Sequence, residues 1–371
     1  MSYDFYATFL PKSPTTKDVD NLVSGGVSAQ AIPDIAARLA LLSGMAAQKE
    51  GVKNYVVNGH SKRGGGYKSL VHHKQERHAE TPYAKALIAP RLSAMEKMGL
   101  LPTAPDFSLL PRGSWFLQFT FTLAKPWMSK DDEPFYVAES VNPVRKDKVF
   151  KVPMMAASSW KGLLRWTAVQ TRLALKKGEL TRERFALERF VQTLLFGDEK
   201  GEEDDKSSSL AEYLDGLFPE ARDQYRQWVR NYFQAEADKA LPNHRGRLLF
   251  FPTFFDLIDV EVINPHSRET RAGRQPVYLE CVPAGAKGTF SLLYVPFDRA
   301  AEDISDEGAK HLRYLAGIIP QLFLKYGFSA KRSSGYGVAK DAIQGKVHTQ
   351  AGETPLTRLS QLDKEVSRVA F

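Results

Sequence analysis

The segment from Gly327 to Val338, with the sequence GFSAKRSSGYGV, combines three residue types that can hold phosphate. Its three glycines permit positive φ angles and let backbone N–H groups approach a ligand closely. Lys and Arg add positive charge, and Tyr offers a face on which a base can stack. We expect the binding residues here to be Lys331, Arg332, Ser333, Ser334, Gly335 and Tyr336. A structural interpretation competes, in which Gly327 ends a helix and a tight turn leads into an edge strand.

A second group of basic residues lies in the run ASSWKGLLR, which has the pattern of a helix start. Ser158 or Ser159 is a suitable N-cap, because a hydroxyl oxygen can accept from the free N–H groups of the first turn. Lys161 and Arg165 stand four residues apart and therefore share one helix face, while Trp160 can pack inward. All four polar residues are candidate contacts to an anion.

The stretch from Lys49 to Lys85 interleaves basic residues with glycine and tyrosine, and Lys62 and Arg63 precede a triple glycine within it. Such spacing suits a phosphate backbone with bases to stack, so we expect a solvated loop or one that contacts RNA. The stretch also holds four histidines, which are His60, His72, His73 and His78. Their spacing fits no ligand motif and no cysteine accompanies them, so we expect no structural metal.

Composition points to a polyanionic partner. The 371 residues carry a formal net charge of +8, with a pI near 9.3. The single cysteine, Cys281, cannot form an internal disulfide, which suits a reducing compartment. The first residues lack a signal-peptide pattern, and no apolar run reaches the length of a membrane span. We therefore expect a cytoplasmic protein without a membrane partner.

Hydrophobic periodicity alternates between helices and strands along the chain. Helices are predicted over residues 31–48, 81–99, much of 181–240, and 306–326 with a kink at Pro320. Strands are predicted over residues 114–123, 246–255, 258–266 and 288–295. Strands that frame helices in this order predict an α+β fold with a ferredoxin-like (RRM-like) sheet and large helical insertions.

Three regions follow from this organisation. Residues 1–110 form a helical and basic N-terminal extension, and residues 111–345 form the ferredoxin-like domain, with a helical insertion at about 181–240. Residues 346–371 are left as a C-terminal tail.

Three motifs together resemble the RAMP superfamily, the RNA-binding subunits of CRISPR effector complexes. They are the helix-opening Ala157–Arg165 segment, which Asn142-Pro143-Val144 precedes, the Gly-Arg-Leu-x-Phe strand from Gly246, and the glycine-rich loop from Gly327. The resemblance covers residues 115–338 and implies a protein that binds crRNA and target RNA beside other RAMP and effector-complex subunits. It adds Asn142 and Arg145 to the candidate RNA contacts. The segment Val262–His266 suggests the subunit that caps the backbone of type III-B complexes.

The related backbone subunits of type III complexes cut target RNA with an aspartate just before the Asn-Pro-Val element. This chain has Val141 there, so the resemblance predicts an RNA-binding subunit without catalytic activity and without a cofactor.

An alternative is a Mg²⁺-dependent endoribonuclease of the same fold, because metal-assisted cleavage needs carboxylates beside the scissile phosphate. Its carboxylates would be Asp131, Asp132 and Glu139, with Glu133 adjacent. His266 could then act as a general base, although a histidine capping a turn is the simpler interpretation. A third possibility is a scaffold whose basic loops contact only proteins.

Overall fold

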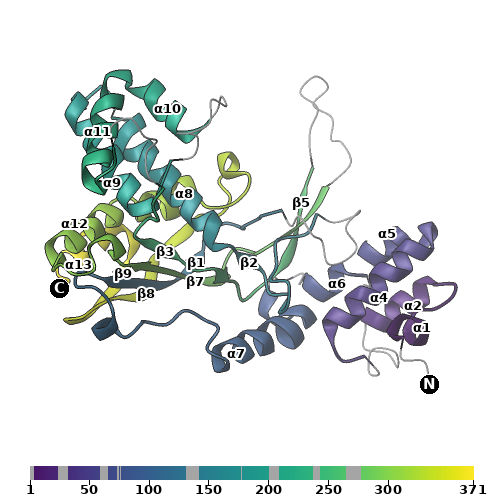
Figure 1. Ribbon diagram of the computed structural model, residues 1–371. Coiled ribbons are helices and arrows are strands. Elements are labelled where there is room, and N and C mark those ends of the chain that lie inside the picture. Colours follow the sequence, from purple (N-terminus) through teal and green to yellow (C-terminus); the bar gives the residue numbers. More distant parts are fainter. Residues whose placement is uncertain are drawn as a thin grey trace.

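The computed structural model describes residues 4–23, 32–58, 66–72, 75, 77–130, 142–176, 178–199, 209–236, 243–264 and 277–371. These residues form an α+β structure around a five-stranded antiparallel sheet (Figure 1). The N-terminal helices lie at one end of the molecule, and the helices of the insertion lie at the other (Figure 1).

The main sheet has the strand order β3-β7-β1-β8-β9. Its strands are β1 (Trp115–Leu123), β3 (Leu248–Phe250), β7 (Lys287–Tyr294), β8 (Ala339–Thr349) and β9 (Gly352–Arg358). β1 is central and pairs antiparallel with β7 and β8. Phe119 and Phe121 of β1 are buried whereas Thr120 and Thr122 are half-buried, which confirms the alternation predicted for this strand.

Helices pack on the face of the sheet that carries Phe119 and Phe121. They are α8 (Ala157–Val169), which follows β1, and α12 (Ser305–Ala316) with a π-helical turn (Gln321–Tyr326), which lie between β7 and β8. Trp160 of α8 is fully buried and stacks on Phe323 of the π-helical turn, with ring centroids 5.3 Å apart. The prediction that Trp160 packs inward is confirmed.

The N-terminal region is helical. Its helices are α1 (Phe5–Phe9), α2 (Thr16–Val23), α4 (Ile35–Gln48), α5 (Glu50–Asn58), α6 (Lys68–Val71), a π-helical segment (Ala84–Ile88) and α7 (Ala89–Lys97). The helices predicted over residues 31–48 and 81–99 are thus present. α4 begins at an N-cap, Asp34, whose carboxylate accepts from the N–H of Ala36 at 2.8 Å.

The helices predicted within residues 181–240 are also present. They are α9 (Arg182–Phe196), α10 (Leu210–Leu217) and α11 (Arg222–Phe233). Arg189 is 1% exposed and joins all three helices: it pairs with Asp215 of the α10 region at 2.6 Å and lies 4.0 Å from the ring centroid of Tyr225 on α11. Arg189 also pairs, at 2.6 Å, with Glu199, which lies in the segment after α9. Removing one member of such a buried group would leave a charge without compensation.

Two short ribbons flank the sheet. β2 (Met154–Met155) pairs with β4 (Thr253–Phe254), and β5 (Asp259–Ile263) pairs with β6 (Val277–Cys281). The strand predicted over 246–255 is therefore divided into β3 and β4, which belong to different sheets. The β5–β6 ribbon holds the N-terminal region: the Tyr67 hydroxyl donates to the Glu280 carboxylate, and His72 Nδ1 lies 2.9 Å from Asp259.

Three expectations need correction. The helix predicted over 306–326 is interrupted at Gly317 and Ile318, before Pro320, which instead precedes the π-helical turn with a helical φ of −60°. α8 begins at Ala157 with Ala156 as its N-cap and no side-chain cap, so neither Ser158 nor Ser159 has that role. β8 crosses the boundary drawn at residue 345, and β9 and α13 (Leu362–Val366) lie in the supposed tail. The extent of β8 and β9 depends on strands distant in sequence with which they pair, and the local pattern does not contain this information.

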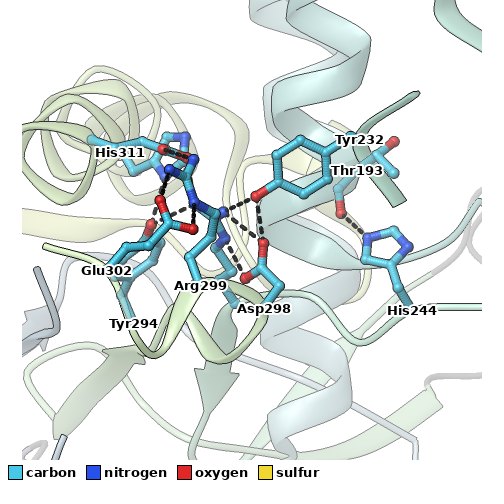
Figure 2. Close-up of polar contacts among 10 residues, drawn as sticks. Thr193, Tyr232, His244, Tyr294, Asp298, Arg299, Glu302 and His311 are labelled. Atoms are coloured by element: carbon cyan, nitrogen blue, oxygen red, sulfur yellow. Dashed lines mark hydrogen bonds and ion pairs between the residues drawn. The ribbon is translucent and has the colours of Figure 1, made fainter. Parts of the chain in front are cut away.

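The Gly-Arg-Leu strand motif is structural. Arg247 is 2% exposed, and its guanidinium binds Asp298 at 2.7 Å and Glu307 at 2.5 Å. Figure 2 shows how Asp298 also accepts from the Tyr232 hydroxyl, at 2.6 Å, so that α11 is tied to the segment after β7. Gly246 lies against Gly197 and Phe196, where a Cβ would collide with the backbone.

His311 gives this network a pH dependence. Burial, reinforced by the charge of Arg247, lowers the pKa of His311 to about 4, and its Nδ1 lies 2.9 Å from the Tyr294 hydroxyl. The unfolded chain therefore binds a proton between about pH 6.5 and pH 4 that the folded chain rejects. Stability falls as pH drops through this window, by up to about 3 kcal/mol from this residue.

We predict that His311→Gln flattens the decline in unfolding free energy between pH 7 and pH 4. Urea unfolding of both proteins across this range measures the difference. Parallel curves for the two proteins would contradict the assignment to His311.

Candidate nucleic-acid interface

The predicted basic helix and the glycine-rich loop meet in the structure. The guanidinium carbon of Arg332 lies 4.4 Å from the ring centroid of Trp166 on α8, within range of a cation–π contact. Residues more than 160 positions apart in the sequence thereby share one surface. This contact joins the glycine-rich loop to the residue that directly follows the Ala157–Arg165 motif.

The glycine-rich loop is held by the segment that follows β1. Trp127 Nε1 donates to the Phe328 carbonyl at 3.0 Å, Gly337 N to Pro126 O at 2.8 Å, and Ala330 N to Met128 O at 2.8 Å. These bonds fix both ends of the loop and leave its tip outside.

The three glycines have the positive φ values predicted for them, 74° at Gly327, 80° at Gly335 and 69° at Gly337. Gly327 is also the C-cap of the π-helical turn, so the structural interpretation of this glycine holds as well. A Cβ on Gly337 would collide with Ser329, whereas the space around Gly335 is open.

The loop tip presents Lys331, Ser333, Ser334 and Gly335, all of which are exposed. Lys331 has a φ of 59°, a left-handed conformation that is uncommon for a residue with a side chain. Arg332 is half-buried against Trp166, and its Nη1 has no hydrogen-bond partner among the described residues.

Tyr336 is positioned by β5 and not at the loop tip. Its hydroxyl lies 3.3 Å from Oε1 of Glu261, and burial together with this carboxylate raises the pKa of the tyrosine. The phenol is therefore a neutral donor to Glu261.

Lys161 and Arg165 share a face of α8, as predicted, and both line a cavity of about 830 Å³. Arg165 also has a structural contact that the sequence did not indicate, because it donates to the carbonyls of Asp198 at 2.8 Å and Gly197 at 3.1 Å. Ser158 lies at the same cavity, whereas Ser159 is not among its lining residues.

The cavity lies between α8 and α10. Its lining residues are Ser158, Lys161, Gly162, Arg165, Trp166, Val169, Gln170, Asp198, Ser209, Leu210 and Tyr213. Its α8 residues recur at helical spacing along one face. Trp166 and Tyr213 were missed by the sequence reasoning. The available signal was a large aromatic residue directly after Arg165, on a face expected to be polar.

Asn142 and Arg145 lie elsewhere. The Asn142 backbone N–H and side-chain amide both donate to Tyr278 O of β6, at 3.0 and 3.2 Å. Arg145 is half-buried, and its N–H donates to Ser129 O at 3.0 Å. The lining of the α8–α10 cavity contains neither residue.

Several predicted residues fall outside the described part of the chain. They are Lys62, Arg63, Asp131, Asp132, Glu133, Glu139, Val141 and His266. Within the described residues, no group of three or more His, Cys, Asp or Glu side chains could hold a metal ion. The same part of the chain has no helix of the length and apolarity that a bilayer span requires.

The sequence pattern of the RAMP superfamily matches residues 136–340, which contain α8, β7 and the glycine-rich loop. The chain therefore belongs to the RAMP superfamily. No curated relative matches it.

Solved structures with similarity to the chain come from CRISPR complexes. One is the type III-B Cmr-β complex bound to cognate target RNA, with 14% identity, a TM-score of 0.40, and coverage of 89% of this chain and 99% of that chain. Another is a Csm3–Csm4 subcomplex of the type III-A interference complex, with 13% identity, a TM-score of 0.33, and coverage of 71% and 100%. A third is a CRISPR RNA-guided surveillance complex in a pre-nicking state, with 12% identity, a TM-score of 0.32, and coverage of 63% and 78%.

The different surroundings of two loop glycines allow a stability test. Gly335→Ala places a side chain at positive φ in open space, which should cost about 1–2 kcal/mol. Gly337→Ala adds the collision with Ser329 and should cost more. Chemical unfolding of both variants measures this order, and equal losses would contradict the close packing at Gly337.

Proposed function

We propose that this chain is a non-catalytic, crRNA-binding subunit of a type III CRISPR effector complex. The observation that supports the proposal most directly is the contact between Arg332 and Trp166, which places the cationic loop beside the basic face of α8 in a RAMP protein. Its partners would be other effector subunits and target RNA. Within the complex we favour the position that caps the backbone of type III-B complexes. The complex would act in the cytoplasm.

The proposed fold assignment is ferredoxin-like. β1 and β3 flank β7 in the sheet and are joined through α8, which fits a split βαβ unit. β7 and β8 flank β1 and are joined through α12 in the same way. β9 would then be an addition at the edge.

The proposed binding mode relies on phosphate contacts. Lys161 and Lys331 are exposed, and α8 starts without a side-chain cap, so its first-turn N–H groups can serve an anion. The guanidinium of Arg332 adds positive charge beside this surface. Binding of this kind tolerates sequence changes in the RNA and weakens steeply with salt.

The absence of catalysis is inferred from the sequence, where Val141 replaces the aspartate expected before Asn-Pro-Val. No cofactor is then required.

Salt dependence tests the phosphate contacts. We predict that Lys161→Ala combined with Lys331→Ala lowers crRNA affinity and reduces the slope of log K against log salt by about 1.4, since each contact to single-stranded RNA contributes about 0.7. The control is Lys97→Ala combined with Lys364→Ala, which removes two exposed lysines from α7 and α13. A slope that stays the same in the first variant would exclude these lysines as phosphate contacts.

Cleavage is tested with labelled target RNA and bound crRNA, with and without Mg²⁺. We expect the target to remain intact in both conditions. Mg²⁺-dependent cutting that disappears when Asp131, Asp132 and Glu139 are changed to Ala would establish the endoribonuclease alternative.

A further inference from the structure

We propose that the α8–α10 cavity receives one nucleobase of the bound RNA, stacked on Trp166. This inference rests on the RNA binding proposed above and adds to it a base-specific contact.

Trp166 is a preformed stacking platform. Its side chain is 36% exposed although it lines a cavity. Arg332 lies over the ring at 4.4 Å, and Tyr326 packs against it nearly perpendicularly, with ring centroids 5.1 Å apart. The indole is thus held by neighbours while part of its surface faces the cavity, so that stacking a base requires little further ordering.

Polar groups on α10 and directly after α8 can together recognise a base edge. Tyr213 of α10 is 46% exposed, and its hydroxyl lies 3.5 Å from Nε2 of Gln170. An amide and a hydroxyl offer both donors and acceptors. Val169 and Leu210 provide apolar surface between them. Convergent polar groups in a mostly apolar cavity of about 830 Å³ are typical of a site for a small organic group.

The charge at the cavity favours a nucleotide over an apolar peptide. Lys161 and Arg165 lie on the lining face of α8. The carboxylate of Asp198 is already bound by the N–H of His244, at 2.8 and 3.0 Å. Lys161 and Trp166 are separated by about 7.5 Å along the helix axis, comparable to one nucleotide. A phosphate at Lys161 therefore leaves its base within reach of Trp166.

Abasic scanning tests the inference. The probes are a labelled crRNA and derivatives that each lack one base. With the unaltered protein, loss of the inserted base should weaken binding at least about fivefold at one position, the size expected for a stacked base. Trp166→Leu keeps apolar bulk but no stacking face, so this penalty should vanish, whereas Trp166→Phe should retain most of it. Thermal unfolding shows that each variant is folded.

Tyr213→Phe is the matched variant for the wall, since it keeps the ring and removes the hydroxyl. It should keep the abasic penalty and change only the preference for the identity of the base. A photoreactive phenylalanine analogue in place of Tyr213 should crosslink to RNA at the same position. Crosslinking only to a protein subunit would overturn the inference.

The two proposals fail separately. One outcome is that crRNA binds with a salt dependence that requires Lys161 and Lys331, while Trp166→Leu leaves every abasic penalty unchanged. The cavity inference is then wrong and the proposed function stands. If the protein retains no crRNA, both are wrong.

Discussion

The position of Trp160 is the constraint on which the rest of the site depends. Its ring is fully buried, stacks on Phe323, and meets Phe290 and Phe328 with centroids 4.9 and 5.0 Å away. Its Nε1 donates to Thr253 Oγ1 at 3.0 Å, so the one polar atom of the indole is satisfied. A single side chain of α8 thereby contacts the sheet, the π-helical turn and the start of the glycine-rich loop. The packing of Trp160 in the core therefore sets the distance between the glycine-rich loop and α8.

The surface of the site follows from that core. Because Phe328 is fixed by Trp160 and by Trp127, the loop can place Lys331 outward and Arg332 back over Trp166. The loop glycines relieve the backbone strain that this path imposes, and Lys331 carries the strain that remains. Rigid loops that expose donors are suited to phosphate, because little ordering is left for the moment of binding.

Buried charge fixes the peripheral regions in a comparable manner. Arg189 and Arg247 hold the α9–α11 insertion together and tie it to the sheet, while Glu280 accepts from Tyr67 and pairs with Lys146 to secure the N-terminal helices. Paired charges of this kind contribute geometry more than net stability, since desolvation offsets much of their attraction. The pairing of Arg189 with Asp215 positions α10, which forms the wall of the cavity opposite α8.

The sequence by itself determined the local elements and the candidate chemistry. Alternation identified β1, helical spacing placed Lys161 and Arg165 on one face, and three glycines with two cations marked a loop able to hold phosphate. These features depend on neighbours within a few residues, which a pattern records. The tertiary structure alone decided that Arg332 covers Trp166, that Arg165 is bound to the end of α9, and that Tyr336 is anchored by Glu261. Each of these contacts joins residues over 30 positions apart, and their formation depends on how the core packs, which no local pattern contains.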